Sequence, residues 1–159
     1  MIRKCRLKDK QRIFHIINEA AKAYKGAIPE DCYHEPYMTM EELLAEMDAM
    51  TFYGYEADKE LTGVMGLQPL EEVTLIRHSY VLPSYQGKGM GTKLLNHLMQ
   101  LAPSKCILVG TWSDAQWAIR FYERNGFKLL PNKDELLRRY WCISERQIET
   151  SVVLGKEKD

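Results

Sequence analysis

Long apolar runs are absent from the sequence. No stretch approaches the roughly 18 consecutive apolar residues that a membrane-spanning helix needs. The chain starts with a basic segment, Met1–Arg6, but no apolar segment follows it, so the pattern of a secretory signal is missing as well. These absences predict a cytoplasmic protein that has no membrane partner.

A surplus of charge of either sign is also absent. The 159 residues carry 22 lysines and arginines against 22 aspartates and glutamates. Nucleic-acid binding draws on surplus basic charge, so this balance argues against nucleic acid as the partner. One short basic segment, Arg138-Arg139-Tyr140-Trp141, could touch nucleic acid, but such side chains on a helix usually cover the core with their aliphatic stems.

Cysteine is sparse, and the four thiols are widely spread: Cys5, Cys32, Cys106 and Cys142. None forms a C-x-x-C pair or clusters with histidine at zinc spacing, so the sequence predicts no metal centre. The remaining composition, 45% apolar and 28% charged, is that of an ordinary globular protein. Because no repeat or linker is visible, we expect residues 1–159 to form one domain, with 156–159 as a frayed tail.

Hydrophobic spacing and turn signals predict an α+β fold with one mixed sheet. One helix should start after Asp9, and a second should be capped by Thr39 with Glu42. The later elements are expected in this order: strands at 52–56 and 61–67 joined by a turn at Asp58-Lys59, a strand at 73–82, a helix over 90–101, a strand at 106–109, a helix capped by Ser113 with Trp117, Ala118, Phe121 and Tyr122 facing inward, a strand at 127–130, a helical turn at 134–141 and a strand at 147–154. The strand, helix, strand order from 73 to 109 predicts two parallel strands.

A glycine-rich segment stands between the strand at 73–82 and the helix that follows. Gly87, Gly89 and Gly91 would let main-chain N–H groups at the start of that helix converge on an anion. The spacing is not that of a dinucleotide fingerprint, which would need glycine where Thr92 stands, nor that of a P-loop. The segment therefore predicts either a phosphate cradle or a glycine-rich turn that binds nothing.

Two motifs resemble those of the GNAT N-acetyltransferases. The segment from Val81 to Gly91 is similar to that family's acyl-CoA-binding motif, Gln/Arg-x-x-Gly-x-Gly/Ala, and Phe121–Phe127 is similar to its second signature, a helix that ends in Tyr-Glu-x-x-Gly-Phe. The resemblance implies a single GNAT-like domain in which two central parallel strands splay apart around the cofactor cleft. It also implies an acetyl-CoA-dependent N-acetyltransferase.

The resemblance implies a role for each residue that matches the cofactor motif. The pantetheine arm would lie along Ser79, Tyr80 and Val81, and the N–H of Val81 could polarise the thioester carbonyl. The diphosphate of acetyl-CoA would lie among the residues of the glycine-rich segment: Gln86, Gly87, Lys88, Gly89, Met90, Gly91 and Thr92. Lys88 could add a cation to this cradle, or could be a solvated loop lysine.

The catalytic residues are harder to predict than the cofactor site. Tyr122 matches the family's general acid, because a phenol is still protonated at neutral pH, and otherwise reads as a core tyrosine. The family's strand glutamate is missing, since Gly110 stands at its place. His78 is then the candidate base, or a histidine held by hydrogen bonds beneath the sheet. The missing glutamate also favours an alternative, a non-catalytic acyl-CoA-binding sensor or interaction module.

The acceptor is not specified by the sequence beyond the amine of a small molecule or a peptide. The segment Tyr33–Tyr37, beside Glu30 and Asp31, lies where family members close over the acceptor. It could form a pocket for a cationic amine, or a surface loop that covers the first helix. The strand expected at 147–154 could also pair with a second copy, which leaves a homodimer possible.

Overall fold

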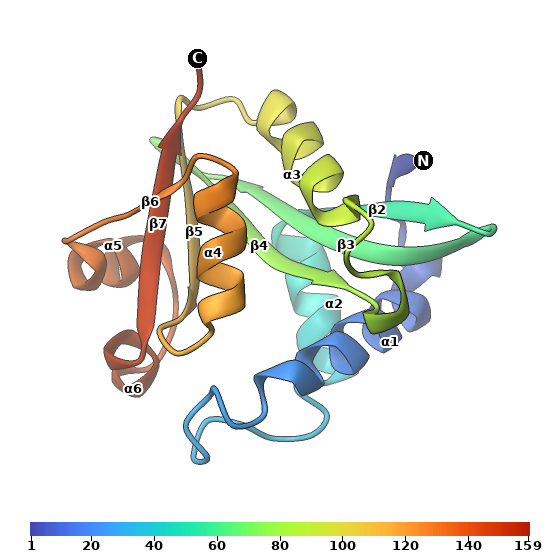
Figure 1. The fold of residues 1–159 in the computed structure, drawn as a ribbon, viewed down its shortest axis with the longest axis horizontal. Coiled ribbons are helices and arrows are strands. Elements are labelled where there is room, and N and C mark those ends of the chain that lie inside the picture. The colour runs from blue at the N-terminus through green and yellow to red at the C-terminus, as the bar shows by residue number, and fades with distance from the viewer.

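Seven strands form one mixed sheet in the computed structural model, which describes residues 1–159 (Figure 1). Across the sheet the strands follow the order β1-β2-β3-β4-β5-β7-β6. Their bounds are β1 Ile2–Lys4, β2 Thr51–Ala57, β3 Glu60–Pro69, β4 Val73–Val81, β5 Cys106–Trp112, β6 Lys128–Leu129 and β7 Ser151–Glu157. The helices are α1 Lys10–Ala21, α2 Met40–Ala49, α3 Met90–Leu101, α4 Gln116–Arg124, α5 Lys133–Tyr140 and α6 Glu145–Glu149. All neighbouring strands are antiparallel except β4 and β5, which confirms the predicted parallel pair.

Local signals explain where the early elements begin and turn. Asp9 directly precedes α1, and the Thr39 hydroxyl accepts from the N–H of Glu42 at the start of α2, as the capping pattern predicts. Asp58 and Lys59 adopt φ angles of 55° and 69° in the turn between β2 and β3. Two successive positive φ values match the right-handed twist of the hairpin's strands.

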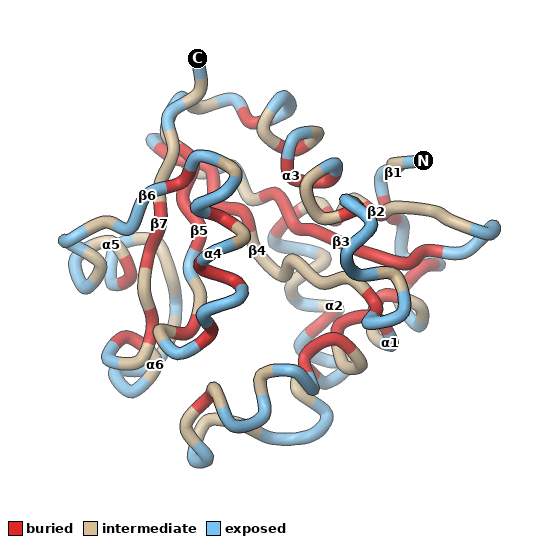
Figure 2. Tube along the Cα trace, viewed as in Figure 1, coloured by how far each residue is buried: buried red, intermediate tan, exposed pale blue.

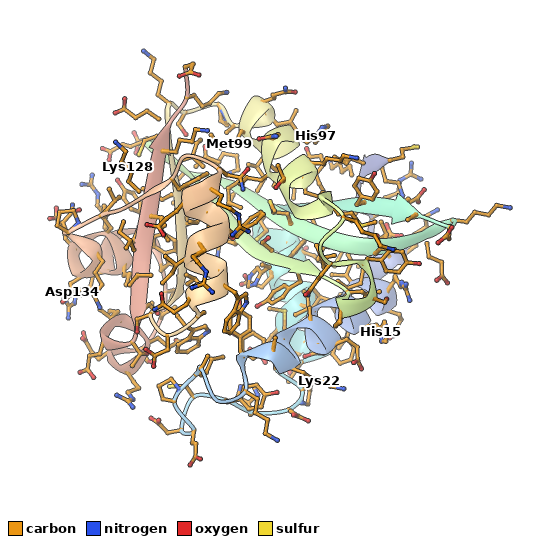
Figure 3. All side chains as sticks on the ribbon, in the orientation of Figure 1. His15, Lys22, His97, Met99, Lys128 and Asp134 are labelled. Atoms are coloured by element: carbon orange, nitrogen blue, oxygen red, sulfur yellow. The ribbon has the colours of Figure 1, made fainter.

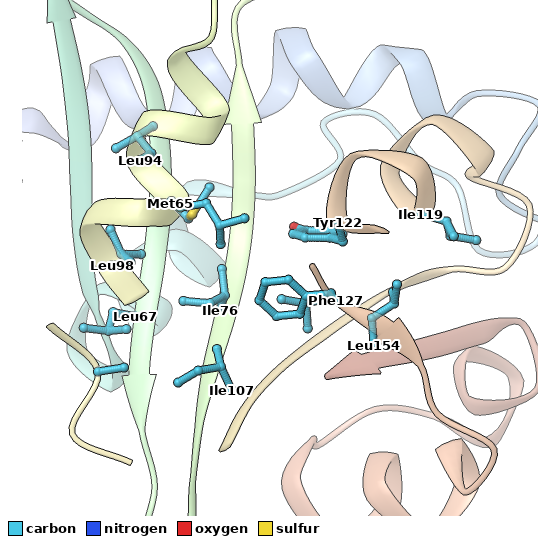
Figure 4. Close-up of a cluster of buried hydrophobic side chains, with 13 residues drawn as sticks. Met65, Leu67, Ile76, Leu94, Leu98, Ile107, Ile119, Tyr122, Phe127 and Leu154 are labelled. Carbon is cyan, nitrogen blue, oxygen red and sulfur yellow. The ribbon is translucent and has the colours of Figure 1, made fainter. Parts of the chain in front are cut away.

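The helices cover both faces of the sheet. On one face, α3 and α4 pack over β3, β4 and β5 in a cluster that includes Met65, Ile76, Leu94, Ile119 and Tyr122 (Figure 4). On the other face, α1 and α2 cover one half of the sheet, while α5 and α6 cover the half that contains β5 and β7. Buried residues accordingly follow the strands and the inner sides of the helices, and exposed residues lie in the loops (Figure 2).

The two parallel strands stay paired over only part of their length. Val73–Ile76 of β4 align with Cys106–Val109 of β5, and no pairing continues beyond these residues. Within β4 the chain bulges at His78, whose φ is 53°, and the register with β3 shifts between Val64 and Gly66. From this point β4 and β5 diverge (Figure 1), which confirms the splay that the family resemblance implies.

Two predictions about the C-terminal third were wrong. Residues 145–149 form α6 rather than the start of a strand, because Ser144 and Gln147 make a reciprocal capping box that starts a helix. The last strand therefore runs over Ser151–Glu157 and pairs with β5 to its end. Residues 156 and 157 are thus part of the sheet and not of a frayed tail.

The start of α4 also differs from the prediction. Ser113 does not cap the helix; its hydroxyl donates to the carbonyl of Thr150 instead, and α4 begins at Gln116. This shift turns Trp117 outward, where it is 42% exposed, and Ile119 takes the inward position. Ala118 and Tyr122 face the core as predicted.

Asp9 joins β1 to the start of α1 through charged hydrogen bonds. Its carboxylate accepts from both terminal nitrogens of Arg3, at 3.0 and 2.9 Å, and from the N–H of Arg6 at 2.8 Å. The hydrogen bonds from Arg3 are the main reason why the pKa of Asp9 is lowered in the folded protein. The folded state thus favours the ionised carboxylate, and Asp9 contributes stability at neutral pH.

Replacing Asp9 with asparagine is expected to lower the free energy of unfolding by about 1–3 kcal/mol at pH 7. The contribution is fully present above the ordinary aspartate pKa of about 3.9 and is lost as pH falls through the lowered pKa of the folded state. The difference from wild type should therefore shrink in acid. Urea unfolding at several pH values measures it, with the exposed Asp114→Asn as the control. A pH-independent difference would contradict this role.

Candidate active site

A cavity of ≈ 180 Å³ opens where β4 and β5 part. Five elements place polar side chains or backbone on it: β4 with Arg77 to Tyr80, β5 with Gly110 to Trp112, α4 with Tyr122, α6 with Gln147 and β7 with Ser151. Aromatic rings complete the wall, namely Tyr24, Tyr37 and Trp141. Of the predicted site residues, the structure thus brings His78, Ser79, Tyr80 and Tyr122 together on one cavity.

The edge of β4 beyond the bulge offers an unpaired backbone donor. The N–H of Leu82 donates to Thr62 of β3 at 2.9 Å, and Val81 lies opposite Gly63 in the same register. Amides alternate in direction along a strand, so the N–H of Val81 points away from β3. It faces the side from which β5 has already diverged, where an extended chain could pair with it.

The glycine-rich segment has the shape of an anion cradle. Gly87 and Gly89 have φ angles of 78° and 81°, a left-handed conformation that glycine adopts without cost, and both are exposed. Gly89 caps α3, and the first helical hydrogen bond runs from the N–H of Lys93 to its carbonyl. The N–H groups of Met90, Gly91 and Thr92 therefore have no partner within the helix and are free to hold a phosphate.

The side chains around this cradle have different roles. Gln86 anchors the segment, since its Nε2 donates to the carbonyl of Val81 at 2.9 Å. The Lys88 ammonium lies 5.2 Å from the centre of the Tyr85 ring, where it remains exposed to solvent. Met90 turns its side chain into the core, and its sulfur accepts from the Thr62 hydroxyl at 3.2 Å. Only the backbone of Met90 is thus available to a ligand.

The ring of Tyr122 packs in the core, and Tyr122 also lines the cavity. The ring packs edge-on against Phe121 and Phe127, and in Figure 4 the hydroxyl points toward β4. Burial raises the pKa of Tyr122 to about 12, while a hydrogen bond with Ser79 opposes that rise. The phenol therefore keeps its proton across the neutral range and can act as a proton donor.

His78 is the only histidine that lines the cavity. His15 is exposed on α1, and His97 of α3 packs against Tyr53 of β2; neither lines the cavity (Figure 3). Nε2 of His78 lies 2.5 Å from a carboxylate oxygen of Glu46 on α2, and the ring stacks on Phe52. Burial lowers the pKa of His78, and the hydrogen bond from the imidazole lowers the pKa of Glu46. At neutral pH the pair is thus a neutral imidazole beside a carboxylate.

Trp141 fills the place where the family's glutamate would stand. A Cβ added at Gly110 would lie 3.3 Å from the Trp141 ring, so a larger side chain there would have to displace the indole. The rest of the basic segment is paired with acidic residues: Arg138 with Glu145 and Arg139 with Glu72. The segment thus contributes one aromatic wall of the cavity and two surface ion pairs.

Only part of the segment at 33–37 reaches the cavity. Tyr37 lines it, and the Trp112 indole donates to the Tyr37 hydroxyl at 3.1 Å. The acidic residues nearby are engaged elsewhere: Glu35 accepts from Tyr33, and Asp31 pairs with Arg146 of α6. The aromatic part of the predicted acceptor pocket is present, whereas these carboxylates do not line the cavity.

Sequence reasoning missed Glu46 and the role of three cavity aromatics, Tyr24, Trp112 and Trp141. A signal for Glu46 was available, because it follows Leu43 by three residues and so lies on the buried face of α2. A carboxylate at such a position needs a partner, which His78 and Arg77 provide.

The structure contains neither a metal-binding cluster nor a helix that could span a membrane. No three or more histidine, cysteine, aspartate or glutamate side chains are grouped so that they could hold a metal ion. The helices are also all too short or too polar to cross a lipid bilayer.

Comparisons with known proteins agree with this geometry. The model of the Acetyltransferase (GNAT) family matches residues 13–127. The PaiA N-acetyltransferase of Thermoplasma acidophilum, solved with coenzyme A, superimposes with a TM-score of 0.77 at 21% identity, covering 99% of this chain and 98% of that one.

Two other solved structures show the same fold. A ribosomal-protein-alanine N-acetyltransferase from Brucella melitensis gives a TM-score of 0.70 at 16% identity over 99% of each chain. A GNAT family acetyltransferase from Elizabethkingia anophelis, with acetyl-CoA bound, gives 0.61 at 20% identity, covering 82% of this chain and 91% of that one. The family match, on a fold with splayed strands and a glycine cradle, shows that the chain belongs to the GNAT family and is an acetyl-CoA-dependent N-acetyltransferase.

Proposed function

We propose that the chain transfers the acetyl group of acetyl-CoA directly to the primary amine of a small molecule or a peptide, with Tyr122 as general acid and His78 as general base. One observation carries this proposal. Tyr122 from α4 and His78 from β4 both line the cavity at the point where β4 and β5 separate.

The residues present fit the cosubstrate. The free N–H groups at the start of α3, with Gly87 and Gly89, would hold its diphosphate, and Ser79, Tyr80 and Val81 would pair with its pantetheine arm. Bound acetyl-CoA supplies an activated thioester. The N–H of Val81 would donate to the thioester carbonyl and stabilise the charge that develops there.

His78 would take the proton of the incoming amine. An alkyl amine is mostly protonated at pH 7, and only its neutral form is a nucleophile. Because burial lowers the pKa of His78, the imidazole is neutral and ready to accept a proton at that pH. The phenol of Tyr122, whose pKa is raised, would give its proton to the departing sulfur.

The cavity supports an acceptor that inserts only its reacting end. Its volume of ≈ 180 Å³ is smaller than the roughly 300–1,000 Å³ of sites that enclose a drug-sized ligand. Aromatic rings from Tyr24, Tyr37 and Trp141 would flank an aliphatic amine and exclude water from it.

Release of free thiol from acetyl-CoA, measured with a panel of amines and peptides, tests the proposal. Wild type should release thiol with at least one acceptor, and His78→Gln should lower kcat by about 100- to 1,000-fold. The acid limb of the wild-type kcat profile that is due to His78 should lie below the ordinary histidine pKa of about 6.5, because the pKa of His78 is lowered. Tight acetyl-CoA binding without release for any acceptor would favour the non-catalytic sensor.

We also propose a cytoplasmic location and a possible homodimer. All four cysteines are free, which is usual for proteins of reducing compartments. The strand expected to pair with a second copy, β7, is bonded to β5 along its length and to β6 only over Leu154 and Gly155, so part of its outer edge is open. Sedimentation velocity would measure the oligomeric state.

A further inference from the structure

The orientation of the His78 imidazole is set by contacts on two sides. The bulge in β4, with a φ of 53° at His78, turns the ring toward the face of the sheet that α2 covers. There the ring stacks on Phe52, with centroids 5.9 Å apart and planes 30° apart. Its Nε2 meets a carboxylate oxygen of Glu46 at 2.5 Å. Stacking fixes the plane of the ring, and the carboxylate fixes its rotation within that plane.

This hydrogen bond also decides which nitrogen carries the proton. A carboxylate can only accept, so the neutral imidazole must hold its single hydrogen on Nε2, and the lone pair is then on Nδ1. Nε2 is the ring nitrogen that bonds to the protein. No side-chain nitrogen or oxygen that is sealed from solvent lacks a hydrogen-bond partner. Nδ1 therefore has access to solvent, and His78 is one of the residues that line the cavity.

We propose that Glu46 is the positioning residue for the general base: it holds the Nε2–H tautomer of His78 and so directs the Nδ1 lone pair to the acceptor amine. This inference rests on the proposed function. Glu46 does not line the cavity, so it acts through His78 and not on the acceptor itself. The carboxylate also stabilises the imidazolium that forms when His78 takes the proton.

The charged groups around His78 fix the sign of the expected pH effect. Glu46 comes from α2, and Arg77 from β4, with one guanidinium nitrogen 3.4 Å from the same carboxylate oxygen. The element β2 contributes the uncharged Phe52, and the nearby tyrosines of the cavity, Tyr24, Tyr37 and Tyr80, stay neutral because burial raises the pKa of each. Glu46 is thus the one negative charge in contact with the ring, and its removal disfavours the imidazolium.

Kinetics of Glu46→Gln test the proposal. This variant keeps the shape of the side chain and removes its charge. We expect kcat to fall by about 10- to 100-fold, less than for loss of the base itself, with the KM for acetyl-CoA unchanged. The acid limb of kcat that is due to His78 should move to lower pH, because a less stable imidazolium has a lower pKa. Asp48→Asn, an equal change of charge at an exposed position of α2, should behave as wild type.

A measurement without turnover checks the tautomer directly. In protein labelled with ¹⁵N-histidine, the signals of His78 are those that vanish in His78→Gln. Wild type should show Nε2 protonated and Nδ1 free at neutral pH. Glu46→Gln should show a mixture of tautomers, because the amide can donate as well as accept. A merely structural Glu46 would leave both the tautomer and the pH profile unchanged.

Three outcomes distinguish a failure of the role of Glu46 from a failure of the proposed function. An Nδ1–H tautomer in wild type, or a wild-type tautomer and pH profile in Glu46→Gln, would overturn the role of Glu46 and leave the proposed function in place. A wild-type kcat in His78→Gln would overturn the base and its positioning residue together. A lower kcat in Glu46→Gln with a shifted acid limb and mixed tautomers would support the assignment.

Discussion

Replacing Tyr122 with phenylalanine is expected to lower kcat by about 100- to 1,000-fold while the KM for acetyl-CoA changes little. The substitution removes one oxygen and keeps the ring, whose edge-on contacts with Phe121 and Phe127 account for its place in the core. The loss is therefore that of a proton donor and not of a packing element.

The direction of the pKa shift makes Tyr122 a suitable donor. Burial raises its pKa to about 12, so a protonated phenol and a neutral His78 coexist across the pH range between their two pKa values. Wild-type kcat should consequently show no basic limb due to Tyr122 below the ordinary tyrosine pKa of about 10. Such a profile, measured from pH 6 to pH 10 with a reactive amine, would be flat above the acid limb.

The control for this variant is Tyr53→Phe. Tyr53 is a half-buried tyrosine of β2 that contacts His97 of α3 and does not line the cavity. The kcat of Tyr53→Phe should equal that of wild type. Tyr53→Phe and Tyr122→Phe should both have melting temperatures within a few degrees of wild type. If Tyr122→Phe kept more than a third of the wild-type kcat, another group would have to protonate the sulfur.

The sequence allowed prediction of elements whose signals are local. Thr39 and Glu42 lie within one helical turn, and the glycines of the cradle adopt backbone angles that follow from their own lack of a Cβ. The parallel pairing of β4 and β5 followed from the helix between them. In these cases the residues that determine the structure are neighbours in the chain.

The pairs that form the acceptor side of the site are distant in the sequence. Glu46 and His78 are separated by 32 residues, and they meet only because a bulge in β4 turns the ring toward α2. Trp141, the residue that follows α5, covers Gly110 across a similar distance in the chain. Such contacts depend on how helices pack on the sheet, and neither periodicity nor capping residues encode that packing.

The prediction of a strand over 147–154 was wrong because a helix-capping signal overlaps the strand pattern there. Ile148, Val152 and Leu154 suited a strand, but Ser144 and Gln147 formed a capping box that started a helix. The strand therefore begins later, at Ser151, and it includes Lys156 and Glu157, which had been expected in the tail. A capping box with both hydrogen bonds outweighs β-propensity, because that propensity depends strongly on context.

Replacing Gly89 with valine is expected to weaken acetyl-CoA binding by at least about 100-fold. The φ of Gly89 is 81°, and nothing lies within 4 Å of where a Cβ would be, so the cost of a side chain comes from the backbone alone. A β-branched residue disfavours this conformation, and the segment would leave it. The N–H groups at the start of α3 would then no longer converge; losing two hydrogen bonds to a charged group, at about 1.5–3 kcal/mol each, corresponds to that weakening or more.

Gly26 provides a matched control for this prediction. Its φ is 92°, and nothing surrounds its Cβ position either, but it lies in the loop after α1 and outside the cradle. Gly26→Val should therefore carry a similar backbone penalty, about 1–2 kcal/mol of stability, and leave the acetyl-CoA dissociation constant unchanged. Isothermal titration of both variants separates strain from recognition. Equal dissociation constants in Gly89→Val and wild type would mean that the diphosphate is held elsewhere, because a helix start that has lost its shape cannot keep the same affinity.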